Sequence, residues 1–294
     1  MTGAAARTAL EHRVETAKGH LHVNEYPGDG PAVIMTHGYP DDSRIYRHLI
    51  PAMPSRHLVT FDFLGYGRSG REATWPLEPG QREGELAAVI EALELDRPVL
   101  VGHDSGGPVV INYCLDNPGR VSHLVLLNTY YGKAPNQEFP EVIRLLADPH
   151  LTPFVDAVMK DQNILGWALN YTDSRLRGEG SGPPDPRGVG YTVILPQFFG
   201  DANQAPATAA IRAWTAELFQ DVELQADHVA AGDVSKLEIP VTLAFGDNDP
   251  YFTRQVADYL QAIFPSVDRH QIADAAHWPQ WDQPAQIAAI IAAL

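Results

Sequence analysis

Short apolar runs, each ending at a turn residue, constrain the fold of this chain more than any other feature. The clearest are Ala32–Thr36 before His37, His57–Phe61 before Asp62, Pro98–Val101 before Gly102, Val121–Leu127 before Asn128, and Val241–Phe245 before Gly246. Runs of this length between turn residues are typical of strands that are buried on both faces of a sheet. We therefore expect a sheet whose strands are covered on both sides.

Helical patterns lie between these runs. We expect helices at 83–95, 106–114, 254–264 and 283–294. Strand followed by helix, repeated, predicts an α/β protein with a mostly parallel central sheet that is flanked by helices. The opening of the chain predicts a hairpin instead, with strands at Arg13–Thr16 and His20–Asn24 and a turn at Lys18-Gly19.

The alternation of strand and helix breaks between about Tyr131 and Lys236. Helical patterns in this part are found at 139–146, 154–168 and 207–218, and a polar loop is expected at Gly178–Gly188. We predict one core domain made of residues 1–130 and 236–294. Residues 131–235 are predicted to form a helical cap domain, inserted after the fourth parallel strand and lying on the carboxyl edge of the sheet.

Composition limits the partners. The formal net charge of −16 disfavours nucleic acid and anionic lipid. The single cysteine, Cys114, excludes an intrachain disulfide. No stretch approaches the roughly 20 apolar residues of a membrane span, and no signal peptide stands out, so we expect a soluble cytoplasmic protein. No metal-ligand cluster, phosphate loop or dinucleotide fingerprint stands out either, so we expect neither metal nor cofactor. The oligomeric state stays open.

The segment Val99–Val109 runs from a predicted strand through a sharp turn into a predicted helix. A nucleophile at the apex of such a turn needs small residues two before and two after it, because bulky neighbours would clash with the strained backbone. With Asp104 at the apex these flanks are Gly102 and Gly106; with Ser105 at the apex one flank is a histidine. Sterics favour Asp104, while a Ser105 nucleophile and a plain helix-capping turn remain open.

Two further segments fit around this turn. His37–Pro40 follows the first apolar run, so the amides of Tyr39 and Ser105 are expected to point at one spot and form an oxyanion hole. Asp249 follows a later run and can orient a histidine, with Asp247 as its competitor. His277 comes 28 residues after Asp249. The order nucleophile, acid, histidine therefore fits a catalytic triad.

On these residues the chain resembles the α/β-hydrolase superfamily, specifically the branch that holds epoxide hydrolases and haloalkane dehalogenases. The motifs that carry the resemblance are His37–Pro40, Asp62–Ser69, Gly102–Gly107, Gly246–Asp249 and His277–Pro279. The resemblance implies the α/β-hydrolase fold, with Asp104 as nucleophile, His277 as base and Asp249 as its partner.

The chain also departs from subtypes of that branch. Many members carry Trp directly after the nucleophile, and fluoroacetate-type dehalogenases carry arginines where Ser105 and Pro108 stand here. Tyr39 resembles epoxide hydrolases more than haloalkane dehalogenases. Asn128 occupies the place where some dehalogenases keep their acid, which favours Asp249 as the partner of the histidine.

The resemblance implies a hydrolase that forms a covalent alkyl ester on the aspartate and acts on a small hydrophobic epoxide. A haloalkane dehalogenase is the alternative. An esterase or lactonase that uses the adjacent serine, a non-hydrolytic tailoring enzyme and a ligand-binding protein also stay open. The candidates for protonating an epoxide oxygen are Tyr171 and Tyr191, with Tyr130 and Tyr131 at the entrance to the cap. The candidates for binding a halide are Trp167, Trp214 and Trp278, and His37 is a candidate for a position beside the substrate.

Overall fold

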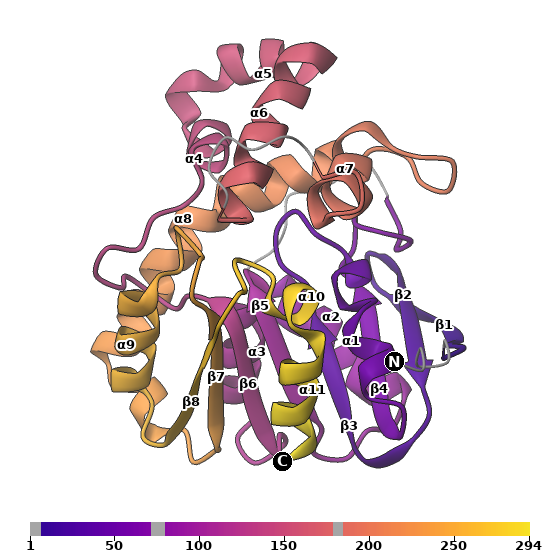
Figure 1. The fold of residues 1–294 in the computed structure, drawn as a ribbon, viewed down its shortest axis with the longest axis vertical. Coiled ribbons are helices and arrows are strands. Elements are labelled where there is room, and N and C mark those ends of the chain that lie inside the picture. Colours follow the sequence, from indigo (N-terminus) through magenta and orange to yellow (C-terminus); the bar gives the residue numbers. More distant parts are fainter. Residues whose placement is uncertain (1–6, 72–79, 179–184) are drawn as a thin grey trace.

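The computed structural model describes residues 7–71, 80–178 and 185–294. In this part of the chain an eight-stranded sheet, ordered β1-β2-β4-β3-β5-β6-β7-β8, forms the centre (Figure 1). Its strands are β1 (Leu10–Thr16), β2 (Gly19–Tyr26), β3 (Asp29–Thr36), β4 (Arg56–Asp62), β5 (Val99–Asp104), β6 (His123–Thr129), β7 (Val241–Gly246) and β8 (Val267–Ile272). β1 and β2 form the predicted hairpin, β2 is antiparallel to β4, and the other pairs are parallel. The predicted mostly parallel sheet is confirmed.

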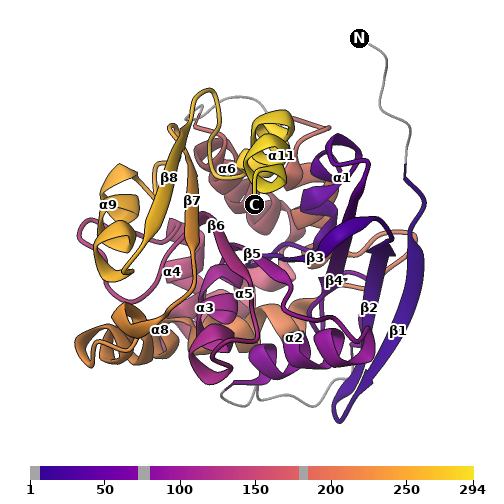
Figure 2. The same cartoon turned by 90° about the horizontal axis from the view of Figure 1, so that it is seen from below.

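Helices cover both faces of this sheet. They are α1 (Leu49–Ala52), α2 (Gln81–Ala92), α3 (Gly106–Asp116), α9 (Arg254–Ile263), α10 (Pro279–Asp282) and α11 (Pro284–Ala292). α2 and α3 pack together on one face, and α1 and α11 pack together on the other (Figure 2). Every residue of β5 and of β7 is buried, which explains why their sequences are continuous apolar runs.

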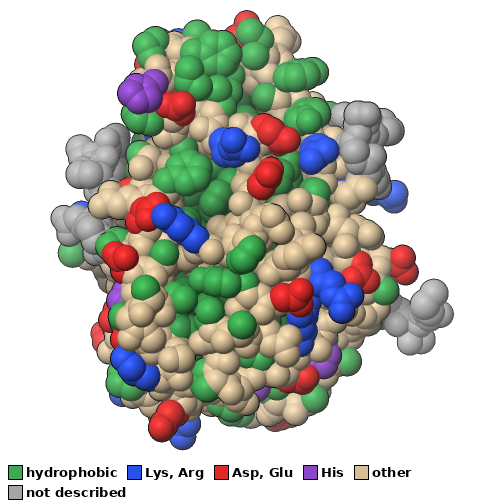
Figure 3. Space-filling view, turned by 90° about the vertical axis from the view of Figure 1, so that its left-hand side faces the viewer, with side chains coloured by type: hydrophobic (Ala, Val, Ile, Leu, Met, Phe, Trp, Pro, Cys, Tyr) green, Lys and Arg blue, Asp and Glu red, His purple; other side chains and the backbone are tan. Residues whose placement is uncertain are grey.

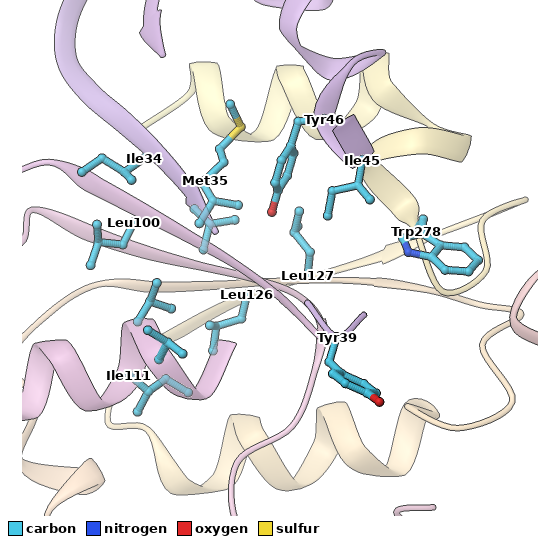
Figure 4. Packing of buried hydrophobic residues seen from close by; sticks show 14 of the residues in the cluster. Ile34, Met35, Tyr39, Ile45, Tyr46, Leu100, Ile111, Leu126, Leu127 and Trp278 are labelled. Carbon is cyan, nitrogen blue, oxygen red and sulfur yellow. The ribbon is translucent and has the colours of Figure 1, made fainter. Parts of the chain in front are cut away.

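The core extends through the sheet to the helices on either side. Figure 4 shows Ile45 and Tyr46 on one side of the strands and Ile111, from α3, on the other. The hydroxyl of Tyr46 donates a hydrogen bond to the carbonyl of Thr36 at the end of β3 (2.8 Å). This bond satisfies a buried phenol and fixes the loop after β3 against the sheet.

Between β6 and β7 the described elements are all helical. They are α4 (Glu141–Ala147), α5 (Thr152–Lys160), α6 (Gln162–Leu176), α7 (Leu195–Phe199) and α8 (Thr208–Ala230), with short helical turns at Pro149–Leu151, Gly190–Ile194 and Val234–Lys236. We call residues 141–230 the helical segment. In Figure 1 it lies above one end of the sheet. Its domain boundaries at residues 131 and 235 stay a prediction.

Two helices of this segment differ from the sequence prediction. The pattern at 154–168 is divided between α5 and α6, because the side chain of Asp161 accepts from the amides of Asn163 and Ile164 and begins a new helix there. The last helix continues well beyond residue 218, to Ala230. The predicted loop Gly178–Gly188 lies partly outside the described residues. None of the helices in the described ranges is long and apolar enough to cross a membrane.

The close packing of α3 against β6 gives a stability prediction. A Cβ on Gly107 would lie 1.9 Å from Oγ1 of Thr129, so Gly107→Ala must displace that side chain. We expect the free energy of unfolding to fall by about 1–3 kcal/mol, measured by urea denaturation. Gly84→Ala is the matched control, since a Cβ there in α2 meets nothing within 4 Å. It should raise stability by about 0.5–1 kcal/mol. Equal effects of the two substitutions would contradict the packing argument.

Candidate active site

The turn between β5 and α3 has a left-handed apex at Asp104. Its φ is +49°, whereas Ser105 is in the ordinary helical region at −66°. A Cβ on Gly102 would lie 2.7 Å from the backbone of α3, and a Cβ on Gly106 would lie 2.5 Å from the carbonyl oxygen of His37. Both flanking positions therefore need glycine, and the residue held in the strained conformation is the aspartate.

Three side chains that are distant in the sequence meet at this apex. Nδ1 of His277 is 2.8 Å from Oδ2 of Asp249, and its Nε2 is 3.9 Å from Oδ1 of Asp104. The amide of Tyr39 donates to Oδ2 of Asp104 at 2.8 Å. All four residues are buried. One oxygen of Asp104 thus rests on a backbone amide, while the other faces the histidine.

The loop after β7 holds Asp249 in a network of donors. Its Oδ1 accepts from the amides of Tyr251 (2.9 Å) and Phe252 (3.1 Å). Its Oδ2 accepts from Nδ2 of Asn128 at 2.8 Å and contacts His277. Burial alone would raise the pKa of Asp249, but the charge of His277 and these hydrogen bonds hold it below the usual value. Asp249 is therefore an ionised partner, and the competitor, Asp247, is exposed.

Opposing effects set the proton on His277. Burial would lower the pKa of this imidazole, but the charges of Asp249, Asp104 and Asp41 raise it to about 9. Burial raises the pKa of Asp104, while the charge of His277 and the amides of Ser105 and Tyr39 work against that rise. The site without substrate therefore favours a protonated histidine, whose positive charge in turn favours the carboxylate form of Asp104.

Sequence reasoning missed Asp41 and the structural part played by Asn128. Asp41 is buried, its Oδ2 accepts from Nε1 of Trp278 (3.2 Å), and Nδ1 of His103 lies 3.6 Å from it. Burial, with the nearby charge of Asp104, raises the pKa of Asp41 to about 7. The only sequence signal for it is its place directly after the His37–Pro40 motif, where a turn would also use an aspartate.

A cavity lies between the triad and the helical segment. The polar residues that line it are Tyr39, Asp104, Ser105, Thr172, Asp173, Tyr251 and His277. Its remaining walls are mainly apolar and include Phe139, Val142, Ile143, Leu146, Leu169, Leu176, Ile194, Phe198, Leu218, Phe252 and Trp278. The cavity measures about 40 Å³. Its lining suits a small hydrophobic compound.

The predicted cap candidates need correction. Tyr171, Tyr191 and Trp167 have 38%, 42% and 70% of their surface exposed, and none lines the cavity. On α6, Leu169 and Leu176 face the cavity, while Trp167 and Tyr171 stack on each other outside it. The sequence showed which residues lay in this segment but not which face of each helix points inward. Figure 3 shows hydrophobic side chains gathered at the top of the molecule, over this segment.

The other two candidates divide between the cavity and the core. Trp278 lines the cavity, but its N–H is bound to Asp41. His37 is buried away from the cavity: its Nδ1 lies 2.8 Å from the carbonyl oxygen of Gly38, and its Nε2 accepts from the amide of Phe63 at 3.0 Å. Burial lowers the pKa of His37 to about 4, so it is neutral. His37 is therefore a structural residue and does not contact a substrate in the cavity.

Within residues 7–71, 80–178 and 185–294, no group of three or more His, Cys, Asp or Glu side chains is placed to hold a metal ion. The site described above consists of side chains and backbone amides. Its arrangement suits attack by a carboxylate or hydroxyl, followed by proton transfer through a histidine.

Comparison with known proteins places this fold and site in a family. The model of the alpha/beta hydrolase fold family matches residues 31–284. The chain belongs to this family. It is 26% identical to the bifunctional epoxide hydrolase 2 of Sus scrofa over 97% of the chain, but it spans only 55% of that relative's length. It is 27% identical to haloalkane dehalogenase 2 of Mycobacterium bovis, with 94% of the chain and 92% of the relative covered.

Solved structures agree on the fold. The chain is similar to the epoxide hydrolase CorEH with a TM-score of 0.73 and 19% identity, over 96% of this chain and 97% of the other. Together with the family match, these similarities identify the chain as a hydrolase-fold enzyme. Its relatives include epoxide hydrolases and haloalkane dehalogenases, as the resemblance in the sequence implies.

The charge network predicts how His277 titrates. Asp249→Asn removes the nearest negative charge, so the pKa of His277 should fall from about 9. The pKa of His277 in this variant should move toward the ordinary histidine value of about 6.5. Titration of the imidazole followed by NMR measures this change. Asp247→Asn is the control, because that exposed carboxylate precedes the network and should leave the pKa unchanged. An unchanged pKa in Asp249→Asn would contradict the network.

Proposed function

We propose that this protein hydrolyses a small hydrophobic epoxide by forming a covalent ester on Asp104. The observation that carries the proposal is the placement of the Asp104 carboxylate. It sits at a strained apex, with one oxygen on the amide of Tyr39 and the other 3.9 Å from Nε2 of His277. That carboxylate faces an apolar cavity, so an uncharged substrate can reach it.

In the first step, Oδ1 of Asp104 attacks an epoxide carbon. An ionised carboxylate can do this without a base. Burial raises the pKa of Asp104, but the charge of His277 and the amides of Ser105 and Tyr39 favour its carboxylate form. The carbon–oxygen bond of the epoxide breaks, and its electron pair stays on the oxygen, which takes up a proton. Tyr39 lines the cavity and carries a hydroxyl, 2.5 Å from Oγ1 of Thr215. Among the described residues two tyrosines line the cavity, Tyr39 and Tyr251, and the hydroxyl of Tyr251 donates to Glu141. We therefore propose Tyr39 as the proton donor, with its hydroxyl turning from Thr215 to the epoxide oxygen when substrate is bound.

In the second step, water attacks Cγ of the Asp104 ester and His277 takes the proton. Negative charge develops on Oδ2, which already accepts from the amide of Tyr39 and has the amide of Ser105 nearby. The bond between Cγ and the esterified oxygen then breaks. The leaving oxygen takes the proton from His277, and the diol leaves with the former carboxylate oxygen. Asp104 keeps the oxygen of the water, and the second proton of the water passes to the phenolate of Tyr39, so the free carboxylate and the phenol are both restored.

Esterification itself prepares His277 for this second step. The pKa of about 9 in the free site depends in part on the negative charge of Asp104. Forming the ester removes that charge, so the pKa of His277 falls when the imidazole is needed as a base. Asp249 keeps its charge and holds the tautomer with Nε2 free to accept a proton.

Two other readings have less support. Oγ of Ser105 contacts the hydroxyl of Tyr130 at 3.2 Å, and no hydrogen bond joins it to His277 in the described structure, so a serine esterase lacks its activated nucleophile. A haloalkane dehalogenase is the second candidate, because the chain is similar to one along most of its length. A halide needs N–H donors, but the N–H of Trp278 is bound to Asp41 and Trp167 is exposed. Epoxide hydrolysis is therefore the first proposal.

A trapped ester tests the proposal. His277→Gln should form the ester and then stall, because no base activates the water. Intact mass spectrometry after exposure to styrene oxide should show a gain equal to the whole epoxide, located on the peptide that holds Asp104. Exposure to 1-bromobutane tests the second candidate, which would give a gain of the butyl group and release bromide.

Asp104→Asn combined with His277→Gln is the control and should gain no mass. Ser105→Ala combined with His277→Gln should still be labelled. A label located on Ser105, or no label with either compound, would contradict the covalent route through Asp104.

Both half-reactions should slow as the pH falls, but each through the titration of a different group. Ester formation should slow as the pH falls through the pKa of Asp104, which burial raises above the usual aspartate value. Ester hydrolysis should also slow with falling pH, because only neutral His277 accepts a proton. Its midpoint should lie below the value of about 9 for the free site. Rapid-quench measurements at a series of pH values separate the two rates. A hydrolysis midpoint at or above 9 would show that Asp104 does not control this histidine.

A further inference from the structure

A second cavity reaches the turn at Asp104 by another route. It lies between α2, α3 and α8, which pack on the same side of the sheet (Figure 2), and it measures about 190 Å³. Ser105 is the one described residue that lines both this cavity and the apolar cavity beneath the helical segment. We call this second cavity the polar passage. It ends inside at the residue directly after Asp104.

The polar passage differs from the apolar cavity in its lining. Asp116, Leu224 and His228 at its outer end are exposed. The remaining polar residues that line it are Arg82, Glu83, Ser105, Asn112, Tyr130, Glu217, Asp221 and Gln225. The lining therefore offers both hydrogen-bond donors and acceptors, as the walls of a hydrated space require. The mixture of one arginine with several carboxylates does not suit a small anion.

Arg82 shows where this hydration would occur. Its side chain is only 10% exposed, and its guanidinium carbon lies 3.8 Å above the ring of Trp214. Nη2 is 3.8 Å from Glu217 and Nη1 is 3.9 Å from Asp221, both too long for direct hydrogen bonds. Nη2 is buried with no hydrogen-bond partner. Gaps of this length between charged groups suit bridging water molecules.

The inner end of the passage carries two hydroxyls. Oγ of Ser105 and the hydroxyl of Tyr130 lie 3.2 Å apart, and Tyr130 lines the polar passage but not the apolar cavity. Each hydroxyl can both donate and accept a hydrogen bond, so the pair can hold a water molecule in transit. Directly before Ser105 in the chain stands Asp104, whose Cγ must be attacked by a water molecule in the second half-reaction.

We propose that the polar passage supplies the water that hydrolyses the Asp104 ester, with the hydroxyls of Tyr130 and Ser105 guiding it to Cγ. This inference rests on the proposed function. Once the ester has formed, its alkyl group fills the small apolar cavity and obstructs water on that side. The polar passage remains clear of the substrate, so water reaches the ester from behind Ser105 while the product is still bound.

Two substitutions in the lining of the polar passage test this proposal. Leu224→Trp places a large side chain at the outer end, and Tyr130→Phe removes one hydroxyl at the inner end. Both substitutions should slow ester hydrolysis about tenfold and leave ester formation unchanged. The reason is that each substitution removes hydrogen bonds from water molecules in the polar passage, and an apolar side chain cannot replace those bonds. Rapid-quench mass spectrometry with styrene oxide measures the two rates, and accumulated ester is the expected signature. Gln220→Trp is the matched control, because Gln220 is exposed on α8 but lines neither cavity.

The outcomes separate this inference from the proposed function. If His277→Gln gives no ester at all, both proposals fail. If ester forms but Leu224→Trp and Tyr130→Phe hydrolyse it at the unaltered rate, the passage alone is wrong. Equal slowing of both half-reactions would also overturn it, since that points to a structural effect. A high-resolution crystal structure gives a second readout: water molecules should bridge Arg82 to Glu217 and Asp221, and a dry passage would contradict the proposal.

Discussion

The close approach of three chain segments around Asp104 is the constraint on which the rest of the site depends. The carbonyl oxygen of Asp104 accepts from Oγ1 of Thr129, at the end of β6, at 2.5 Å. From the other side, a Cβ on Gly38 would lie 2.5 Å from the side chain of Asp104. The ends of β3, β5 and β6 thus hold one residue in a left-handed conformation that it would not adopt alone. Packing of the surrounding strands offsets the energetic cost of that conformation, and the turn directs the carboxylate into the cavity.

The charges around this turn form a balanced set. Three buried carboxylates, on Asp41, Asp104 and Asp249, surround the single imidazole of His277 and raise its pKa. Each carboxylate has a different set of donors: the indole of Trp278, the amide of Tyr39, and Asn128 with two backbone amides. The pKa values of Asp41 and Asp104 are raised and that of Asp249 is lowered, so one residue type has different proton affinities within one site. In the proposed mechanism, environment rather than residue identity decides which carboxylate attacks and which one orients the histidine.

The sequence predicts the sheet and the triad because both depend on short-range rules. Buried parallel strands are mainly apolar, and a strained apex requires small residues on either side, so sterics favour Asp104 over Ser105 as the apex. The interior of the helical segment was not predictable in the same way. Leu169 and Tyr171 stand two positions apart on α6, yet one lines the cavity and the other is exposed. That difference depends on how the helix is rotated over the sheet, and such packing is not encoded in any local pattern.

Tyr39 joins two parts of the molecule that are far apart in the chain. Its amide holds the carboxylate of Asp104, while its hydroxyl lies 2.5 Å from Thr215 on α8. The aromatic ring between them packs against Trp214 of the same helix. Any displacement of α8 is therefore transmitted through one rigid side chain to the donor that stabilises the reacting oxygen. The helix α8 above the cavity and the amide that binds Asp104 are thus coupled through Tyr39. The shape of a bound substrate that displaces α8 can therefore influence the reactivity of the Asp104 carboxylate.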